Sequence, residues 1–255
     1  GGNVMMATGN DGYTKYGFKL STGLLENDWA ATVSLSRTTG EQFVDATTID
    51  AYSYFLNVAK KIGENHELSF TAFGAPQRHG QRQNRLLIDD FRRSDRGIRT
   101  NTDYGYKNGQ LVNIEDNFYH KPQMSLNHYW TINDISSLTT AVYYSFGTGG
   151  GGGTAGTNKF GKYDTDYRTQ EFGPVNLDKI IAENKALGQA TSAETFLRAS
   201  RNNHQWYGLV TNFNHNFSER ISMNVGVDGR MYTGDHFRQV VDFYGLTGWA
   251  NDDRT

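Results

Sequence analysis

Apolar and polar residues alternate along much of the chain, which predicts β-strands because successive side chains of a strand point to opposite faces. Residues 221–233 show the pattern most clearly. One face of this segment carries Ile221, Met223, Val225, Val227 and Met231. The other face carries Ser222, Asn224, Gly226, Asp228 and Arg230. The same alternation predicts eight strands, which span approximately residues 12–25, 29–39, 51–62, 67–75, 123–132, 135–147, 204–217 and 221–233.

Short and long connections alternate between these strands. Tight turns lie at 26–28, 63–66, 133–134 and 218–220, and longer connections lie at about 40–50, 76–122 and 148–203. In an up-and-down meander all tight turns therefore share one end of the sheet and all long loops share the other. Structureless loops beyond ~15 residues are uncommon in compact soluble domains, whereas short periplasmic turns and long extracellular loops are typical of outer-membrane barrels. We predict an all-β fold, a segment of a transmembrane, antiparallel up-and-down β-barrel.

The alternation also predicts which side chains face lipid, because a membrane barrel turns apolar side chains outward and polar ones toward its lumen. The apolar positions expected to point outward include Leu35, Val58, Leu209, Val225 and Val227. The polar positions expected to point inward include Thr32, Asn57, Asn212 and Asp228. The aromatic residues expected to form an interfacial girdle are Trp29, Trp130 and Phe217.

Composition narrows the function. The formal charge of −2 offers no basic surface for nucleic acid. The chain has no cysteine, which excludes disulfides and thiolate metal sites, and its histidines lack metal-ligand spacing. Mean hydropathy is −0.66 and no apolar run reaches the ~18 residues of a membrane helix, but barrel strands never form such runs. The sequence contains no catalytic constellation, so we expect no enzyme and no bound metal or cofactor.

The predicted strand directions place both chain ends with the long loops. Residues 1–11 precede a strand that runs toward a tight turn, and residues 234–255 follow a strand that runs away from one. Small complete barrels keep both termini with the short turns. We therefore expect residues 1–255 to be an inner part of a single larger barrel domain, with 12–25 and 221–233 as its unpaired edge strands.

Three segments carry a family resemblance. They are DGYTKYGFKLSTGLLENDWAATVSLSRTTG (11–40), DAYSYFLNVAKKIGENHELSFTAFGAPQRHGQR (50–82) and NFNHNFSERISMNVGVDGRMYTGDHFRQV (212–240). They resemble the barrel of TonB-dependent outer-membrane transporters, in the branch that includes SusC-like proteins. The resemblance covers essentially the whole chain. It rests on the pattern of strands and turns rather than on a unique motif. It implies a barrel of about 22 strands, of which this chain supplies about eight. The family's plug domain and TonB box have no counterpart in this sequence.

The resemblance implies active import of a large, scarce nutrient, such as a glycan, a siderophore or cobalamin. It also implies a location in the outer membrane of a Gram-negative bacterium. The implied partners are outer-membrane lipid, the nutrient, and the TonB complex, which would be reached through N-terminal parts that this sequence does not contain. The alternatives are a passive porin, a barrel enzyme such as a phospholipase, and a surface-binding barrel.

The 76–122 loop holds the candidate ligand-binding residues. Arginine suits bidentate capture of carboxylate or phosphate, and aromatic rings can stack on sugars or siderophores. The candidates are Arg92, Arg93, Arg96, Tyr104, Tyr106, Phe118, Tyr119 and His120. As alternatives, the arginines bridge the loop to lipopolysaccharide or to its own acids, and the aromatic residues pack within the loop.

Two further features lie in the 148–203 connection. The glycines of residues 149–153 lack the Lys and Ser/Thr of a phosphate-binding loop, so we expect a flexible loop. Residues 176–187 predict a short helix capped by Asn176. Its apolar stripe comprises Leu177, Ile180, Ile181 and Leu187. This helix either packs on neighbouring loops or docks a surface lipoprotein.

Overall fold

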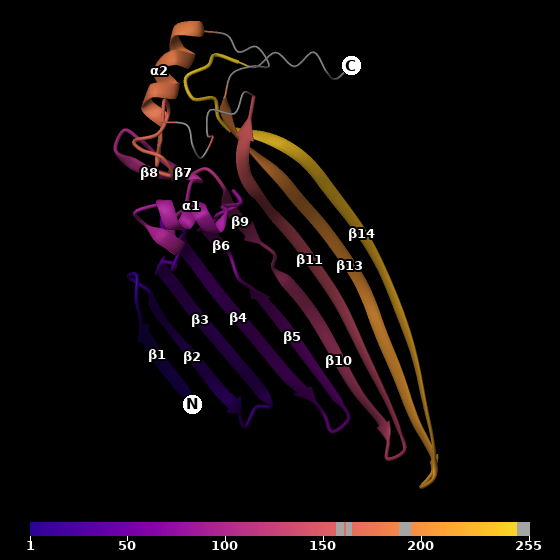
Figure 1. The fold of residues 1–255 in the computed structure, drawn as a ribbon. Helices are drawn as coiled ribbons and strands as arrows, with labels where there is room; N and C mark the ends of the chain where they lie inside the picture. Colours follow the sequence, from indigo (N-terminus) through magenta and orange to yellow (C-terminus); the bar gives the residue numbers. More distant parts are fainter. Residues whose placement is uncertain (157–160, 162–164, 189–194, 249–255) are drawn as a thin grey trace, which may run out of the picture.

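The computed structural model describes residues 1–156, 161, 165–188 and 195–248. Nine antiparallel strands follow one another along its main sheet in chain order (Figure 1). They are β1 (Gly2–Thr8), β2 (Thr14–Leu24), β3 (Trp29–Glu41), β4 (Thr48–Ile62), β5 (His66–Gly74), β10 (Gln123–Asn133), β11 (Ser136–Ala155), β13 (Phe196–Ser218) and β14 (Ile221–Asp242). Within the described residues β1 and β14 each have a partner on one side only, so the sheet is open.

The sheet contains all eight strands predicted from the sequence, and one more. Strand β1 was predicted as a loop because its residues show little alternation, yet it pairs with β2 from Gly2–Leu20 to Thr8–Thr14. The segment 12–25 is therefore not an edge strand. The N-terminus lies with the tight turns rather than with the long loops (Figure 1), which corrects the expectation for that end. Strand β14 ends among the long loops as expected, and residues 251–255 lie outside the described part.

The connections follow the predicted order with one exception. The four predicted tight turns lie at one end of the sheet, and the two long connections lie at the other (Figure 1). The β1–β2 turn is tight but lies at the long-loop end, where Gly9 N donates to Tyr13 O at 2.9 Å. Its central residues Asp11 and Gly12 have φ of 56° and 70°, a left-handed conformation that suits Asp and Gly.

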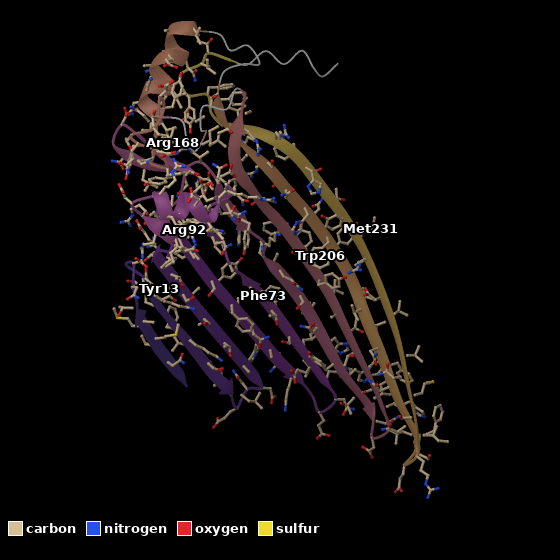
Figure 2. The ribbon with its side chains drawn as sticks, viewed as in Figure 1. Tyr13, Phe73, Arg92, Arg168, Trp206 and Met231 are labelled. Carbon is tan, nitrogen blue, oxygen red and sulfur yellow. The ribbon has the colours of Figure 1, made fainter. Side chains whose placement is uncertain are left out.

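Strand register sorts the side chains into an apolar face and a polar face. One row of directly paired residues on the apolar face is Leu20, Val33, Leu56, Ala72, Met124, Tyr144, Tyr207 and Met231. A row on the polar face is Ser21, Thr32, Asn57, Thr71, Ser125, Tyr143, Gly208 and Arg230. Met231 lies on the apolar face and Trp206 on the polar face; both are labelled in Figure 2.

The predicted facing agrees with this register. Leu35, Val58, Leu209, Val225 and Val227 all lie on the apolar face. All except Val58, which is half-buried, are exposed. The four residues expected to point inward lie on the polar face.

The long connections are structured rather than loose. From the first, β6 (Gln77–Gly80) and β9 (Asp116–His120) join the main sheet between β4 and β11. The same connection contains α1 (Ile88–Arg93), the 3₁₀ turn η1 (Gly97–Arg99), β7 (Tyr104–Lys107) and β8 (Gln110–Asn113). The second contains β12 (Val175–Asn176) and α2 (Leu177–Leu187). In the described residues, no helix is both long enough and apolar enough to cross a membrane.

The two long connections pack together with the segment that follows β14 into one unit, which we call the cap: residues 81–115, 165–188 and 243–248. Strands β12, β7 and β8 form a second, three-stranded sheet in the cap. The buried cluster that holds it comprises Ile114, Val175, Leu177, Ile180, Leu197 and Tyr244. Because Leu197 belongs to β13, the same cluster fixes the cap on the main sheet.

The 149–153 segment is not the flexible loop that its sequence predicts. It lies inside β11, paired with β13 on one side and with β9 on the other. A Cβ on Gly149 would approach Phe118 O to 2.8 Å, and one on Gly152 would approach Ile114 O to 2.7 Å. Gly149 and Gly152 are therefore required where the chain at β9 passes close to β11, which is a recognised role of glycine in a strand.

Candidate ligand-binding site

The structure divides the predicted ligand-binding residues between two places. Arg92 and Arg93 end helix α1, and Arg96 directly precedes η1. Tyr104 and Tyr106 lie in β7, within the cap sheet. The remaining three, Phe118, Tyr119 and His120, lie in β9 of the main sheet. The predicted set is therefore not one site.

Two of the three arginines hold the cap together. Arg96 forms a bidentate pair with Asp45, with Nε and one terminal nitrogen at 2.6 and 2.8 Å from its two oxygens. Arg93 pairs with Glu171 and lies over the ring of Phe172. These contacts link the first long connection to the β3–β4 connection and to the second long connection. They agree with the alternative that the arginines bridge to acids, although these acids belong to neighbouring connections.

Asp45 has two cationic partners. Besides its pair with Arg96, its Oδ1 lies 3.5 Å from Arg99 Nε. Hydrogen bonds and charge from Arg96, then Arg99, hold the pKa of the Asp45 carboxyl below its usual range against the opposing effect of partial burial. The carboxylate is therefore ionised across the physiological range and keeps the β3–β4 connection attached to the cap.

All three arginines are exposed, but Arg92 differs from Arg93 and Arg96 because it has no ion-pair or hydrogen-bond partner among the described residues. Figure 2 labels it at the end of α1. Of the three predicted arginines, it alone presents an unpaired guanidinium at the surface of the cap.

The predicted aromatic residues have mostly internal partners. Tyr104 and Tyr106 contact each other edge to face, with centroids 6.1 Å apart, as the packing alternative expected. His120 Nε2 lies 2.9 Å from the Tyr54 hydroxyl. Because strands alternate, Phe118 and His120 lie on the apolar side of the sheet, while Tyr119 lies on the opposite side.

Phe118 belongs to a cluster that the sequence did not indicate. The guanidinium carbons of Arg78 and Arg201 lie 5.5 and 5.0 Å from its ring centroid, within cation–π range. Arg78 Nε also donates to Asp116 Oδ2 at 2.7 Å. The arginines come from β6 and β13, which are more than a hundred residues apart, so no spacing in the sequence brings them together.

This cluster lines a cavity of about 780 Å³ between the cap and the upper parts of β4, β6, β9, β11, β13 and β14. The volume falls within the ~300–1,000 Å³ of typical ligand sites. Its charged lining residues are Asp50, Arg78, Lys107, Asp116, Arg201 and Asp242. Lys107 of β7 forms an ion pair with Asp242 at the end of β14, and this contact connects the cap to the sheet beside the cavity.

Three polar atoms of the cavity lining have no hydrogen-bond partner in the described part of the chain. They are Asn113 Oδ1, Asp116 Oδ1 and Arg201 Nε. Asp116 is only 7% exposed, and a buried polar atom without a partner costs about 1–3 kcal/mol. Such a concentration at one cavity marks it as a candidate ligand site.

Arg168 is the buried charge that sequence reasoning missed. It is 4% exposed and donates to Gly161 O, Gly173 O and Thr102 O at 2.9, 2.6 and 2.9 Å. The last bond joins the two long connections. Figure 2 labels it in the cap. Neutral carbonyl partners leave no charge pattern in the sequence, so no signal identified this residue.

Helix α2 forms as predicted, but its apolar stripe faces inward. The Asn176 side chain accepts from Lys179 N at 3.0 Å, as an N-cap does. Leu177 and Ile180 are fully buried in the cap cluster. Leu187 is 60% exposed and is the only residue of the stripe left fully outside. The described residues contain no group of three or more side chains suited to hold a metal ion.

Comparison with known proteins identifies the fold. No protein-family model matches the sequence, and no curated protein matches it in a sequence comparison. The structure is similar to a crystal structure of the ferric-catecholate import receptor Fiu from E. coli K12, in its closed form. The TM-score is 0.58 and the identity 12%, over 92% of this chain. This chain spans 32% of that receptor's length. The large antiparallel sheet therefore has the fold of a β-barrel segment of a TonB-dependent receptor.

Proposed function

We propose that this chain forms part of the wall of a TonB-dependent transporter in the outer membrane of a Gram-negative bacterium. The transporter would import a large, scarce nutrient of the siderophore, cobalamin or glycan class. The observation that carries the proposal is the apolar face of the sheet. Leu126 and Val142, on fully paired inner strands, are 49% and 51% exposed. A soluble protein rarely leaves so extended an apolar surface uncovered, whereas lipid would cover it.

The ends of the sheet support the same proposal. Short turns at one end and a structured cap at the other suit a barrel with a periplasmic and an extracellular side. One neighbour of known structure is an import receptor, which supports a transport class in general. Energy would come from the TonB complex through parts outside this sequence. The SusC-like branch rests on the strand-and-turn resemblance alone, and a surface lipoprotein partner would have to contact the cap beyond the buried stripe of α2.

Within the predicted ligand-binding set, the structure favours Arg92 for contact with an incoming nutrient. Arg92 is exposed and its guanidinium has no ion-pair partner among the described residues, so an anionic group could bind it without breaking an ion pair there. Arg93 and Arg96 would act indirectly, by holding the loop that presents Arg92. Tyr106, which is exposed in the cap, would offer aromatic surface there, whereas the exposed Tyr119 of β9 belongs to the other place.

The test compares Arg92→Ala with Arg96→Ala in a strain that depends on this protein. Growth is measured with an iron-siderophore, cobalamin or a glycan as the limiting nutrient. We expect Arg92→Ala to weaken uptake of the transported nutrient about tenfold, since a charge-assisted hydrogen bond contributes about 1.5–3 kcal/mol, while the cap stays as protease-resistant as in the wild type. Arg96→Ala should instead increase proteolysis of the cap.

A strain lacking TonB separates the transporter from a passive porin. Import of the nutrient should stop without TonB. Uptake that continues at the wild-type rate in that strain would contradict the proposal and favour the porin. Binding without uptake in either strain would favour a surface-binding barrel.

A further inference from the structure

The cavity beneath the cap opens on the apolar side of the sheet, not on the polar side. Side chains alternate without a register shift along β13 from Leu209 to Ala199. Arg201 therefore shares a face with Leu209 and Tyr207. The same parity along β14 places Gln239 with Val227 and Met231. The cavity continues the apolar face beyond its exposed hydrophobic part, so it lies outside the lumen that an imported nutrient would cross.

The unpaired atoms of the cavity restrict the chemistry of an occupant. Asn113 Oδ1 and Asp116 Oδ1 require hydrogen-bond donors, whereas Arg201 Nε requires an acceptor. An ammonium group satisfies the two oxygens but is repelled by Arg201. A carboxylate or phosphate satisfies Arg201 but is repelled by Asp116. A hydroxyl group both donates and accepts, so neighbouring hydroxyls on one neutral molecule satisfy all three atoms.

The charge of the lining agrees with a neutral occupant. Three acids, Asp50, Asp116 and Asp242, face three bases, Arg78, Lys107 and Arg201. Arg37 additionally forms a bidentate pair with Asp50, at 2.9 and 3.0 Å. The lining itself therefore carries equal numbers of acids and bases, and Arg37, outside the lining, adds one positive charge beside Asp50.

Two glycines keep the floor of the cavity free of side chains. Gly150 and Gly152 of β11 lie on this face, between Arg201 and Asp116. A Cβ on Gly150 would lie 3.2 Å from Arg201 Cδ and 3.3 Å from Phe118 Cζ. Side chains at these positions would displace the groups that the ligand would contact.

We propose that this cavity binds a neutral, polyhydroxylated ligand of the carbohydrate type, at a site on the outer wall that is separate from the import route. Asp116 and Asn113 accept from its hydroxyls, and Arg201 donates to one of them. The sugar is either free in solution or the headgroup of a glycolipid, whose acyl chains would lie on the apolar face directly below.

The experiment uses the protein produced in a Gram-negative outer membrane and purified in detergent. Two galactose-containing probes distinguish the sources: lactose in solution, measured by calorimetry, and a fluorescent digalactosyl diacylglycerol in mixed micelles, measured by anisotropy. Binding of lactose assigns the site to a free sugar. Binding of the galactolipid alone assigns it to a lipid headgroup. Either result supports the site, and binding of neither probe overturns it.

Substitutions in the cavity lining test whether the probe binds there. Arg201→Gln and Asp116→Asn should each weaken binding about tenfold, because each replaces a hydrogen bond to a charged group with a weaker one to a neutral amide. The matched control is Arg238→Gln, on the neighbouring strand and the opposite face, directly paired with Ser200. It should bind as the wild type does. Equal binding by all three variants overturns the assignment.

A second pair of variants, at Asn113, tests the site in case Arg201→Gln or Asp116→Asn fails to fold. Asn113→Asp keeps an acceptor at the unpaired position, whereas Asn113→Leu removes it at similar size. Both remove the Nδ2 donor that binds Thr48 Oγ1 at 3.2 Å. The Thr48 hydroxyl can donate to the carboxylate of Asn113→Asp but not to the leucine of Asn113→Leu, so protease resistance of the cap is measured for both variants. Binding that survives only in Asn113→Asp supports the ligand contact, and equal binding by both contradicts it. Nutrient uptake should be unchanged in every variant of this pair, which separates failure of this site from failure of the proposed transport function.

Discussion

Glu115 lies between β8 and β9, where the cap meets the main sheet, and it is half-buried. Burial raises the pKa of its carboxyl to about 6, with a smaller contribution from Asp103 and an opposing one from Arg198. The cap therefore binds the protonated carboxyl better than the ionised one. Its neighbour Asp116 pairs with Arg78, whereas Glu115 has no ion pair within the described part of the chain, so the two adjacent acids have different surroundings.

The raised pKa of Glu115 makes the cap most stable in mild acid. Below the ordinary pKa of ~4.3 the carboxyl is neutral in both states and costs nothing. As the pH rises through about 6, that advantage is lost, because only the folded state resists ionisation. We expect the cap to open more readily at pH 7 than at pH 4.5 by roughly 1 kcal/mol, after discounting for the exposed part of the carboxyl.

Hydrogen exchange of a peptide covering residues 110–120, corrected for intrinsic rates, measures this difference. Glu115→Gln should protect the peptide at pH 7 and abolish the change with pH. Glu64→Gln, in the exposed β4–β5 turn, is the control and should leave the change intact. The same pH dependence in wild type and Glu115→Gln would assign the effect to another group.

For single residues, the sequence predicts which side chains form interactions better than it predicts their partners. Arg92, Arg93 and Arg96 are equivalent in sequence, and only the fold shows that Asp45 and Glu171 engage two of them. Arg168 bonds to backbone carbonyls, which every residue carries, so its role has no sequence signal. Phe118 was identified for its ring, but the arginines on either side of it come from distant strands.

Among the elements, β11 shows how glycine can specify a close approach of chains rather than a loose loop. On the polar face, Gly151 has nothing within 4 Å of where its Cβ would lie. On the other face, a Cβ added to Gly152 would lie 2.7 Å from Ile114 O and 2.8 Å from Asp116 N. Adjacent glycines of one strand therefore meet different constraints.

Gly152→Ala and Gly151→Ala should have opposite effects on stability. The added methyl group of Gly152→Ala meets backbone that cannot turn aside, so we expect a loss of about 1–3 kcal/mol, as in other overpacked sites. Gly151→Ala fills open space and restricts the unfolded chain, which favours folding by about 0.4–1 kcal/mol. Thermal unfolding in detergent, together with protease resistance of residues 110–120, measures both. Equal destabilisation by the two variants would mean that strand flexibility, not contact with β9, selects glycine.

Prediction of the elements succeeded where the pattern within one segment determines the structure. It failed where pairing with another strand also decides it. Alternation alone identified the eight strands that were predicted. The helix N-cap Asn176, together with the apolar stripe that follows it, identified α2. The glycine run was misassigned because β-propensity treats glycine as a loop former, although pairing on both sides of β11 overrides that tendency. Strand β1 was missed because Val4, Met5 and Met6 are consecutive apolar residues, and only pairing with β2 assigns them to faces.

Over the whole molecule, the apolar face runs without a break from β2 to β14, and the cap lies at one end of it. The alternation of single strands therefore adds up to a surface that no single strand reveals. The sequence predicted the sheet order and its facing because tight turns fix which strands are neighbours. It did not predict the cap, which depends on contacts between the two long connections, such as that of Arg168 with Thr102.

A pair of arginine substitutions in β11 tests whether lipid covers the apolar face. Val142 and Ala141 are adjacent in the middle of the lower half of a strand with partners on both sides. Val142 is on the apolar face and Ala141 on the polar face, paired with Asn127. Arginine on a lipid-facing position near the bilayer midplane costs about 2–4 kcal/mol. Arginine facing a polar lumen keeps its contact with water and should cost far less.

We therefore expect Val142→Arg to reduce folding stability in lipid by about 2–4 kcal/mol, and Ala141→Arg to reduce it by well under half as much. Urea titration of the protein refolded into phosphatidylcholine vesicles measures both values. In detergent the difference should shrink, because micelles deform around a charge more readily than a bilayer does. If Ala141→Arg is the more harmful variant in lipid, the polar face is the buried one, and the sheet closes around a dry core rather than a lumen.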